Sequence, residues 1–145
     1  MTAGDAMAGP QLRASSFEIA YGWFHRFVAA CCLVFGLLYW TRLVGYYPGD
    51  LWRFDLMPVH WQVAAVSLAT LYPLAASGLW MVASWGPVIW VICAATETIM
   101  YLGFPELFGH RPTVLALHGL TAALFVVFRI ALFIGGHRRR RLGED

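Results

Sequence analysis

Four long apolar stretches decide what this chain of 145 residues can fold into. They cover about 22–47, 58–83, 86–104 and 113–135, and each is close to the ~20 residues that a helix needs to cross ~30 Å of hydrocarbon. Charged residues make up 12% of the chain, against roughly 25% in a soluble domain, and the mean hydropathy is +0.64. The sequence therefore predicts an all-α integral membrane protein with four transmembrane helices.

The segments outside these stretches are short. Residues 1–21 are polar and precede the first apolar stretch, so we expect a cytoplasmic N-terminal tail and not a cleavable signal peptide. Residues 136–145 should form a second, arginine-rich cytoplasmic tail. The very short connection at 84–87 makes the second and third helices antiparallel neighbours, which predicts an antiparallel four-helix bundle.

Arginine sets the expected orientation, because the chain contains no lysine and short cytoplasmic loops carry the excess of positive charge. Arg13, Arg26 and a run after the fourth stretch fall on one side, against Arg42, Arg53 and Arg111 on the other. We therefore expect both termini in the cytoplasm and the protein in the bacterial inner membrane. The run consists of Arg138, Arg139, Arg140 and Arg141, which also suits binding to anionic lipid.

Glu97 lies in the middle of the third apolar stretch, where an ionisable group marks a functional site by default. His118 and Arg129 are eleven residues apart, and therefore on one face of the fourth helix. At ~1.5 Å per residue, Glu97 lies ~16 Å, Arg129 ~9 Å and His118 ~26 Å from the cytoplasmic boundary. The three residues form a predicted intramembrane polar cluster, in which Arg129 reaches Glu97 directly and His118 needs helix tilt or a bridging water.

Two roles for Glu97 follow from its partner. A tight ion pair with Arg129 would make the carboxylate a structural link between helices. If Arg129 instead extends to the cytoplasm, Glu97 and His118 could form a proton-binding pair, since imidazole exchanges protons near neutral pH.

A haem site is a third alternative, because membrane bundles with paired histidines can ligate haem. His60 and His118 are the one credible pair, although His60 lies ~9 Å nearer the surface on the same count. Gln62 could line an outer vestibule with His60. No other cofactor is expected.

No metal site or enzyme site is expected. Cys31, Cys32 and Cys93 fall within the apolar stretches and are interpreted as small packing residues. The chain has no glycine-rich phosphate loop, CxxC, HExxH or GxSxG motif, and its loops are too short for a catalytic domain. These observations predict a protein without enzymatic activity.

The stretches SGLWMVASWGPVIWV and ETIMYLGFPELFG resemble a family of small, functionally uncharacterised bacterial inner-membrane proteins with four spans. In layout the chain is more loosely similar to DoxX-like four-helix membrane proteins. The small multidrug exporters offer a different comparison, but their membrane glutamate lies on the first span and not the third. The resemblance implies fold and location, and no catalytic assignment.

Two functions remain open beside haem binding. Small size, tight loops and abundant aromatic residues favour a structural or accessory subunit of a larger membrane assembly. Glu97 and His118 favour the alternative, a small homo-oligomeric proton-coupled carrier. The expected partners are the lipid bilayer and either another protein or further copies of the chain, and no nucleic acid.

Overall fold

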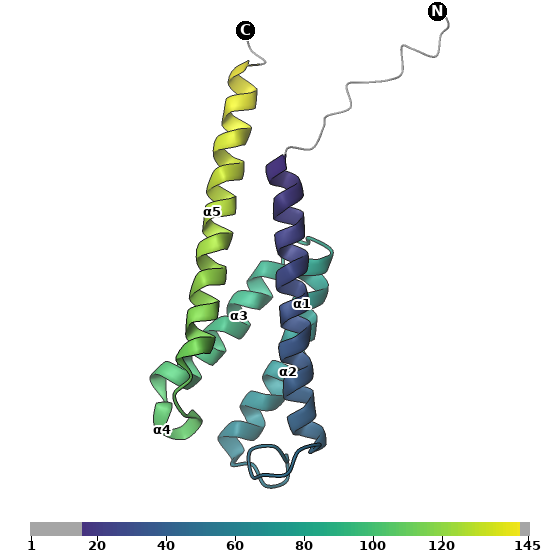
Figure 1. The fold of residues 1–145 in the computed structure, drawn as a ribbon, viewed down its shortest axis with the longest axis vertical. Helices are drawn as coiled ribbons and strands as arrows, with labels where there is room; N and C mark the ends of the chain where they lie inside the picture. The colour runs from purple at the N-terminus through teal and green to yellow at the C-terminus, as the bar shows by residue number, and fades with distance from the viewer. Residues whose placement is uncertain (1–15, 143–145) are drawn as a thin grey trace, which may run out of the picture.

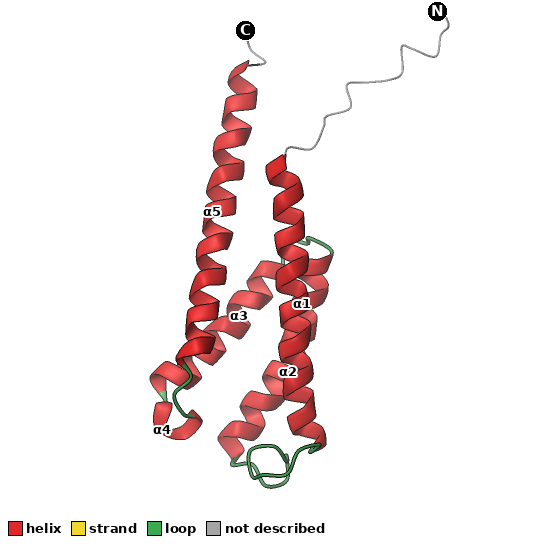
Figure 2. Cartoon of the chain, in the orientation of Figure 1, coloured by secondary structure: helices red, strands yellow, loops and turns green. Residues whose placement is uncertain are grey.

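The computed structural model describes the backbone of residues 16–142 and the side chains of residues 16–136. Its elements in this range are all helical (Figure 2): α1 (Ser16–Val44), α2 (Val59–Trp80), α3 (Gly86–Thr98), the π-helical turn η2 (Ile99–Gly103), α4 (Pro105–Phe108) and α5 (Pro112–Leu142). Four helical segments are long and apolar enough to cross a membrane, namely α1, α2, α3 with η2, and α5. The regular elements of residues 16–142 are therefore all helices, and the four apolar segments give the chain the character of a multi-pass membrane protein.

The first and last helices extend beyond the apolar stretches that predict them. α1 begins at Ser16, six residues before the expected start at 22, and Glu18 lies in its first turn. A carboxylate there is favourable because it faces the positive end of the helix dipole. α5 continues to Leu142, beyond the expected end at 135. Arginine is a good helix former and suits a helix C-terminus, so the polar run lengthens the helix.

Three of the helices pack closely and the fourth stands apart (Figure 1). α2 packs along α1 and against α3, whereas α5 makes few contacts with α1 and α3. α3 lies obliquely between two points: one of its ends is beside α4 and the start of α5, and the other is beside the C-terminal end of α2. We call the end where α1 begins and α5 ends the terminal side, and the end with α4 and the α1–α2 connection the loop side.

Small residues allow the closest helix contacts, as expected for packing in lipid. A Cβ atom on Gly78 would lie 2.4 Å from the Trp85 ring, and one on Gly86 would lie 2.6 Å from the Gly78 backbone. Gly36 of α1 likewise faces the ring of Pro73, at 2.9 Å from such a Cβ. These contacts hold α2 tightly between α1 and α3, and so fix the helices that carry the site.

Candidate functional site

The carboxylate of Glu97 joins the four helical segments that are long and apolar enough to cross a membrane. Tyr39 of α1 donates a hydrogen bond to Glu97 Oε1 over 2.5 Å, and Tyr72 of α2 donates to Oε2 over 2.8 Å. His118 of α5 lies with Nε2 at 2.6 Å from the same Oε2. Glu97 itself is 1% exposed. We call these four residues the Glu97 cluster.

Aromatic stacking positions the two hydroxyl donors. The rings of Tyr39 and Tyr72 are nearly parallel, at 15°, with centroids 6.0 Å apart. Phe35 of α1 also stacks on the Tyr72 ring, with centroids 5.6 Å apart. Because the rings are held by α1 and α2, both hydroxyl groups point at one carboxylate that α3 supplies.

His118 completes the Glu97 cluster from the side of α5. The residue is 7% exposed, and its ring lies edge-on to Trp90 of α3 with centroids 6.2 Å apart. With its proton on Nε2 the imidazole donates to Glu97, and a second proton on Nδ1 would make the contact an ion pair. The geometry therefore allows one proton to be exchanged between an imidazole and a carboxyl group inside the bundle.

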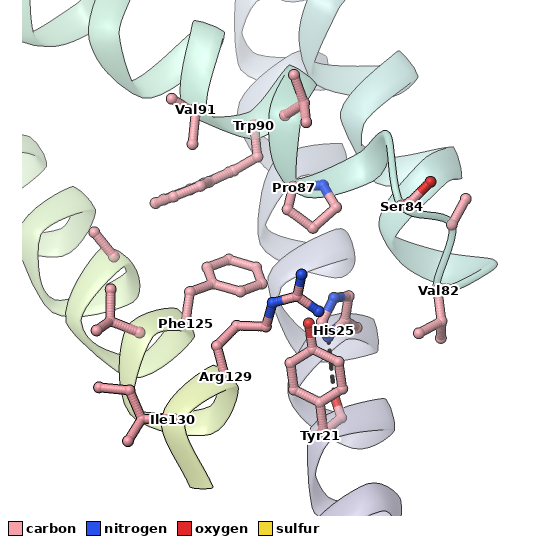
Figure 3. A pocket seen from close by; sticks show the side chains of 14 residues that line it. Tyr21, His25, Val82, Ser84, Pro87, Trp90, Val91, Phe125, Arg129 and Ile130 are labelled. Atoms are coloured by element: carbon pink, nitrogen blue, oxygen red, sulfur yellow. Dashed lines mark hydrogen bonds between the residues drawn. The ribbon is translucent and has the colours of Figure 1, made fainter. Parts of the chain in front are cut away.

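Arg129 does not reach Glu97, so the predicted partner order is reversed. Its guanidinium lies beside His25 and Tyr21 on the terminal side, as Figure 3 shows. His118, which the depth count placed too far away, makes the direct contact instead. The count failed because α3 is inclined to α5, so that each residue of α3 advances less than 1.5 Å along the direction of α5 (Figure 1).

A pocket of about 610 Å³ opens on the terminal side between α1, α3 and α5. His25 and Arg129 bring nitrogen atoms to a lining that is otherwise largely apolar (Figure 3). His25 is 1% exposed and donates from Nδ1 to the Tyr21 carbonyl over 3.0 Å. Trp90 and Phe125 line the pocket with their ring centroids 5.2 Å apart, and Trp90 is also in ring contact with His118 of the Glu97 cluster.

Two smaller cavities border the Glu97 cluster directly. One, of about 60 Å³, lies toward the loop side and is lined by Glu97, Tyr39 and two arginines, Arg42 and Arg111. We call it the loop-side cavity. The other, of about 40 Å³, touches His118 and Tyr72 and shares Trp90 with the terminal-side pocket. The Glu97 cluster thus lies between hollow spaces that approach it from opposite sides.

The side chains of His60 and Gln62 form hydrogen bonds with the backbone of neighbouring loop-side segments. His60 Nε2 donates to the Leu107 carbonyl over 3.3 Å, and Gln62 Nε2 donates to the Phe54 carbonyl over 2.9 Å. His60 and His118 do not face each other as a haem pair, because their Nε2 atoms are engaged with Leu107 and Glu97 respectively. The histidines therefore do not fit a haem between them in this arrangement.

The remaining residues considered in the sequence analysis are the three cysteines and the C-terminal arginines. Cys31, Cys32 and Cys93 are free thiols, and the last two are buried. Within the side chains that the structure describes, no group of three His, Cys, Asp or Glu residues is placed to hold a metal ion. Arg138, Arg139, Arg140 and Arg141 lie on the last turns of α5, and their side chains fall outside the described residues.

Sequence reasoning missed three residues of this region: Tyr39, Tyr72 and Arg42. Tyr72 lies in the middle of α2, far from the interfacial level where tyrosine is usual, so its hydroxyl group needed a buried partner. Arg42 was counted among the loop-side charges, yet it is 6% exposed. A tyrosine at the centre of a span was the available signal.

The comparisons with known proteins identify a family but no activity. A family of unknown function (DUF6163) matches residues 19–135, a range that contains α2, α3 and η2 whole and most of α1 and of the apolar part of α5. No curated protein and no solved structure matches the chain. Because the match covers most of the sequence, the chain belongs to the DUF6163 family of unknown function.

Proposed function

We propose that this protein is a small proton-coupled carrier, in which the Glu97–His118 pair takes up and releases the coupling proton. The observation that carries the proposal is the 2.6 Å contact between Glu97 Oε2 and His118 Nε2, buried among four membrane helices. Ionisable groups at such depth are costly and mark ion or proton pathways. No enzymatic step is assigned to the protein.

The surroundings of the pair support proton exchange. Tyr39 and Tyr72 stabilise the carboxylate by donating to it, so Glu97 remains bonded after it has lost a proton. The loop-side cavity reaches Glu97 directly. On the opposite side, Trp90 stands between His118 and the terminal-side pocket. A movement of this one indole would extend the pocket to the proton-binding pair.

A π-helical turn follows Glu97 within two residues. Such turns occur frequently at functional sites because they interrupt the regular α-helical hydrogen bonds and redirect side chains. Here η2 carries Tyr101, which lines the loop-side cavity together with Glu97. The local irregularity therefore coincides with the candidate site.

The proposed setting is the bacterial inner membrane with both termini in the cytoplasm. The excess of arginine on the terminal side supports this orientation. In it, the terminal-side pocket faces the cytoplasm and the loop-side cavity faces the periplasm. The pair would then exchange protons between these two compartments.

The experiment is a proton-flux measurement on purified protein in liposomes that contain a pH-sensitive dye. Glu97→Gln keeps the shape of the side chain but removes its ionisable carboxyl group. We expect this variant to lose the pH-driven flux, whereas Glu106→Gln, which changes an exposed carboxylate of α4, should retain it. Flux that is equal in Glu97→Gln and the unchanged protein would overturn the proposal.

A purely structural Glu97 cluster predicts a different outcome. The Glu97→Gln variant would then lose thermal stability and show the same residual flux per folded molecule as the unchanged protein. Size-exclusion chromatography and a melting curve of each variant in detergent separate loss of folded protein from loss of transport.

A second candidate, an accessory subunit, is favoured by the exposure of α5. Only 6% of the most apolar part of this helix is buried, against 50% for α2. A helix with so little cover within its own chain is suited to contact another one, either a partner protein or a second copy. The same observation supports the homo-oligomer that the carrier proposal expects.

Native mass spectrometry of protein extracted from its own membrane distinguishes these arrangements. A multiple of the 16.2 kDa chain mass supports the homo-oligomer, and the mass of an added polypeptide supports the accessory subunit. Val127→Trp on the exposed face of α5 should disrupt either complex, whereas Val34→Trp on the exposed face of α1 should not. A monomer mass for the unchanged protein would contradict both.

A further inference from the structure

Arg42 is a buried cation near the loop side of the bundle. The residue is 6% exposed on α1, and its Nη1 atom is buried with no hydrogen-bond partner among the residues that the structure describes. Buried arginine nitrogens are normally paired, because a guanidinium group loses its hydration when it enters an apolar environment. The position therefore lacks a hydrogen-bond acceptor.

Aromatic rings compensate part of this charge. The guanidinium carbon of Arg42 lies 4.6 Å from the centroid of Trp52, 5.0 Å from that of Trp61 and 5.7 Å from that of Tyr39. Such contacts attract a cation to the ring face. A ring face does not complete the planar pattern of N–H donors that a guanidinium group presents to an anion. The three rings thus hold Arg42 in place and leave a donor available.

The missing acceptor has a space to occupy. Arg42 lines the loop-side cavity of about 60 Å³, together with Tyr101 and Arg111. A cavity needs about 10–15 Å³ to hold one water molecule, so this space admits an ion of a few heavy atoms. It is too small for a sugar.

The charges around the loop-side cavity favour an anion. Arg42 and Arg111 both line this cavity, and the guanidinium carbon of Arg111 is 5.9 Å from the centroid of the Tyr101 ring. Glu97 supplies a negative charge, but its oxygens already accept hydrogen bonds from two tyrosines and contact His118. Two arginines facing one engaged carboxylate leave the cavity with an excess of positive charge.

We propose that the loop-side cavity binds a small monovalent anion, of the size of chloride or formate, with Arg42 Nη1 as its principal donor and Arg111 as a second cation. This inference rests on the proposed carrier function and names its substrate class. A bound anion and the Glu97 carboxylate carry charge of the same sign and repel each other, and a proton taken up by the Glu97–His118 pair offsets this repulsion. The same cavity then couples the uptake of an anion to the uptake of a proton by Glu97 and His118.

The test is an equilibrium measurement with chloride on the purified protein in maltoside detergent, which contains no lipid phosphate. The line width of the chloride-35 NMR signal is followed during titration, with sodium gluconate keeping the ionic strength constant. Gluconate is too large for the cavity. We expect a saturable broadening that added formate removes by competition.

Three variants assign the site. Arg42→Gln should abolish the saturable broadening, and Arg111→Gln should weaken chloride binding by about tenfold, because each removes a charged donor. Arg53→Gln is the matched control, since Arg53 is an exposed arginine of the same region that pairs with Asp55 instead. If Arg42→Gln does not fold, the Arg111→Gln variant decides the result.

The absence of saturable broadening, or equal broadening in the unchanged protein and the Arg111→Gln variant, would overturn the anion site. Because the maltoside detergent contains no lipid phosphate, saturable broadening in it reports chloride itself and not a lipid head group. Because the measurement involves no gradient, it is independent of proton flux. Chloride binding without Glu97-dependent flux refutes the carrier alone, and Glu97-dependent flux without chloride binding refutes the anion site alone.

Discussion

Trp40 donates its indole N–H to the backbone carbonyl of Ala69 across the contact between α1 and α2, over 3.0 Å. In a regular helix this carbonyl would accept from the residue four positions later, which here is Pro73. Proline has no N–H to donate. Trp40 therefore supplies, from a neighbouring helix, the hydrogen bond that Pro73 removes from α2.

Trp40→Phe should lower the free energy of unfolding in detergent by about 1–2 kcal/mol. The phenyl ring fills most of the same space but leaves the Ala69 carbonyl without a donor in an environment that lacks water. The midpoint of thermal unfolding measures the effect. Trp80→Phe, on an exposed face of α2, is the control and should change the midpoint little. An equal change in both variants would show that the indole N–H has no special role.

The apolar stretches and the small residues predicted most of the fold, because both act locally. Lengths near 20 residues locate the spans, and the glycine-containing connection at 84–87 makes α2 and α3 adjacent. The inclination of a helix could not be predicted in this way, since it depends on which side chains of neighbouring helices meet. The oblique course of α3 follows from contacts such as Gly78 with Gly86, and no single stretch of sequence encodes that angle.

Gly78→Ala should destabilise the contact between α2 and α3. A Cβ atom at this position would lie 2.4 Å from the Trp85 ring and 2.8 Å from the Gly86 backbone, so that at least one of them must move. Overpacking of this kind costs about 1–3 kcal/mol. Gly22→Ala is the control, because a Cβ atom there meets nothing within 4 Å. The thermal midpoint should fall for Gly78→Ala and stay equal or rise for Gly22→Ala.

The candidate site shows where residue spacing is sufficient and where it is not. Glu97 and His118 were recognisable because ionisable residues in apolar stretches are rare. The direct contact between Glu97 and His118 could not be predicted in the same way, because a shift of a few ångströms in helix depth decides whether His118 or Arg129 is the partner of Glu97. Tyr39 and Tyr72 were missed because a tyrosine in a span resembles a packing residue until its acceptor is known.

Tyr39→Phe and Tyr72→Phe should each lower the free energy of unfolding by about 1.5–3 kcal/mol if Glu97 is ionised. Each variant removes one hydroxyl donor to the carboxylate and keeps the stacked ring. The double variant should differ from the sum of the single ones, because the two donors share one acceptor group. Tyr46→Phe, in the exposed α1–α2 connection, serves as the control. If both single variants and the double variant leave the free energy of unfolding nearly unchanged, the two hydroxyl groups do not stabilise the Glu97 carboxyl group.

Val82 has a φ angle of +54°, in the left-handed region that β-branched residues rarely adopt. It lies in the connection between α2 and α3, where the next residue donates its backbone N–H to the Gly78 carbonyl over 2.9 Å. The hydrogen bond closes the end of α2 and holds the strained conformation in place. The strain costs about 1–3 kcal/mol, and it falls on a residue that lines the terminal-side pocket.

Val82→Gly should therefore raise the free energy of unfolding by about 1 kcal/mol. Glycine adopts the left-handed conformation without strain, and this gain exceeds the extra freedom that glycine gives the unfolded chain. Val82→Asn should act in the same direction, because asparagine tolerates this region, whereas Val82→Ile keeps the branched Cβ and should change little. Thermal midpoints of the three variants in one detergent measure the order. A midpoint that falls for both Gly and Asn would show that contacts of the valine side chain outweigh the backbone strain.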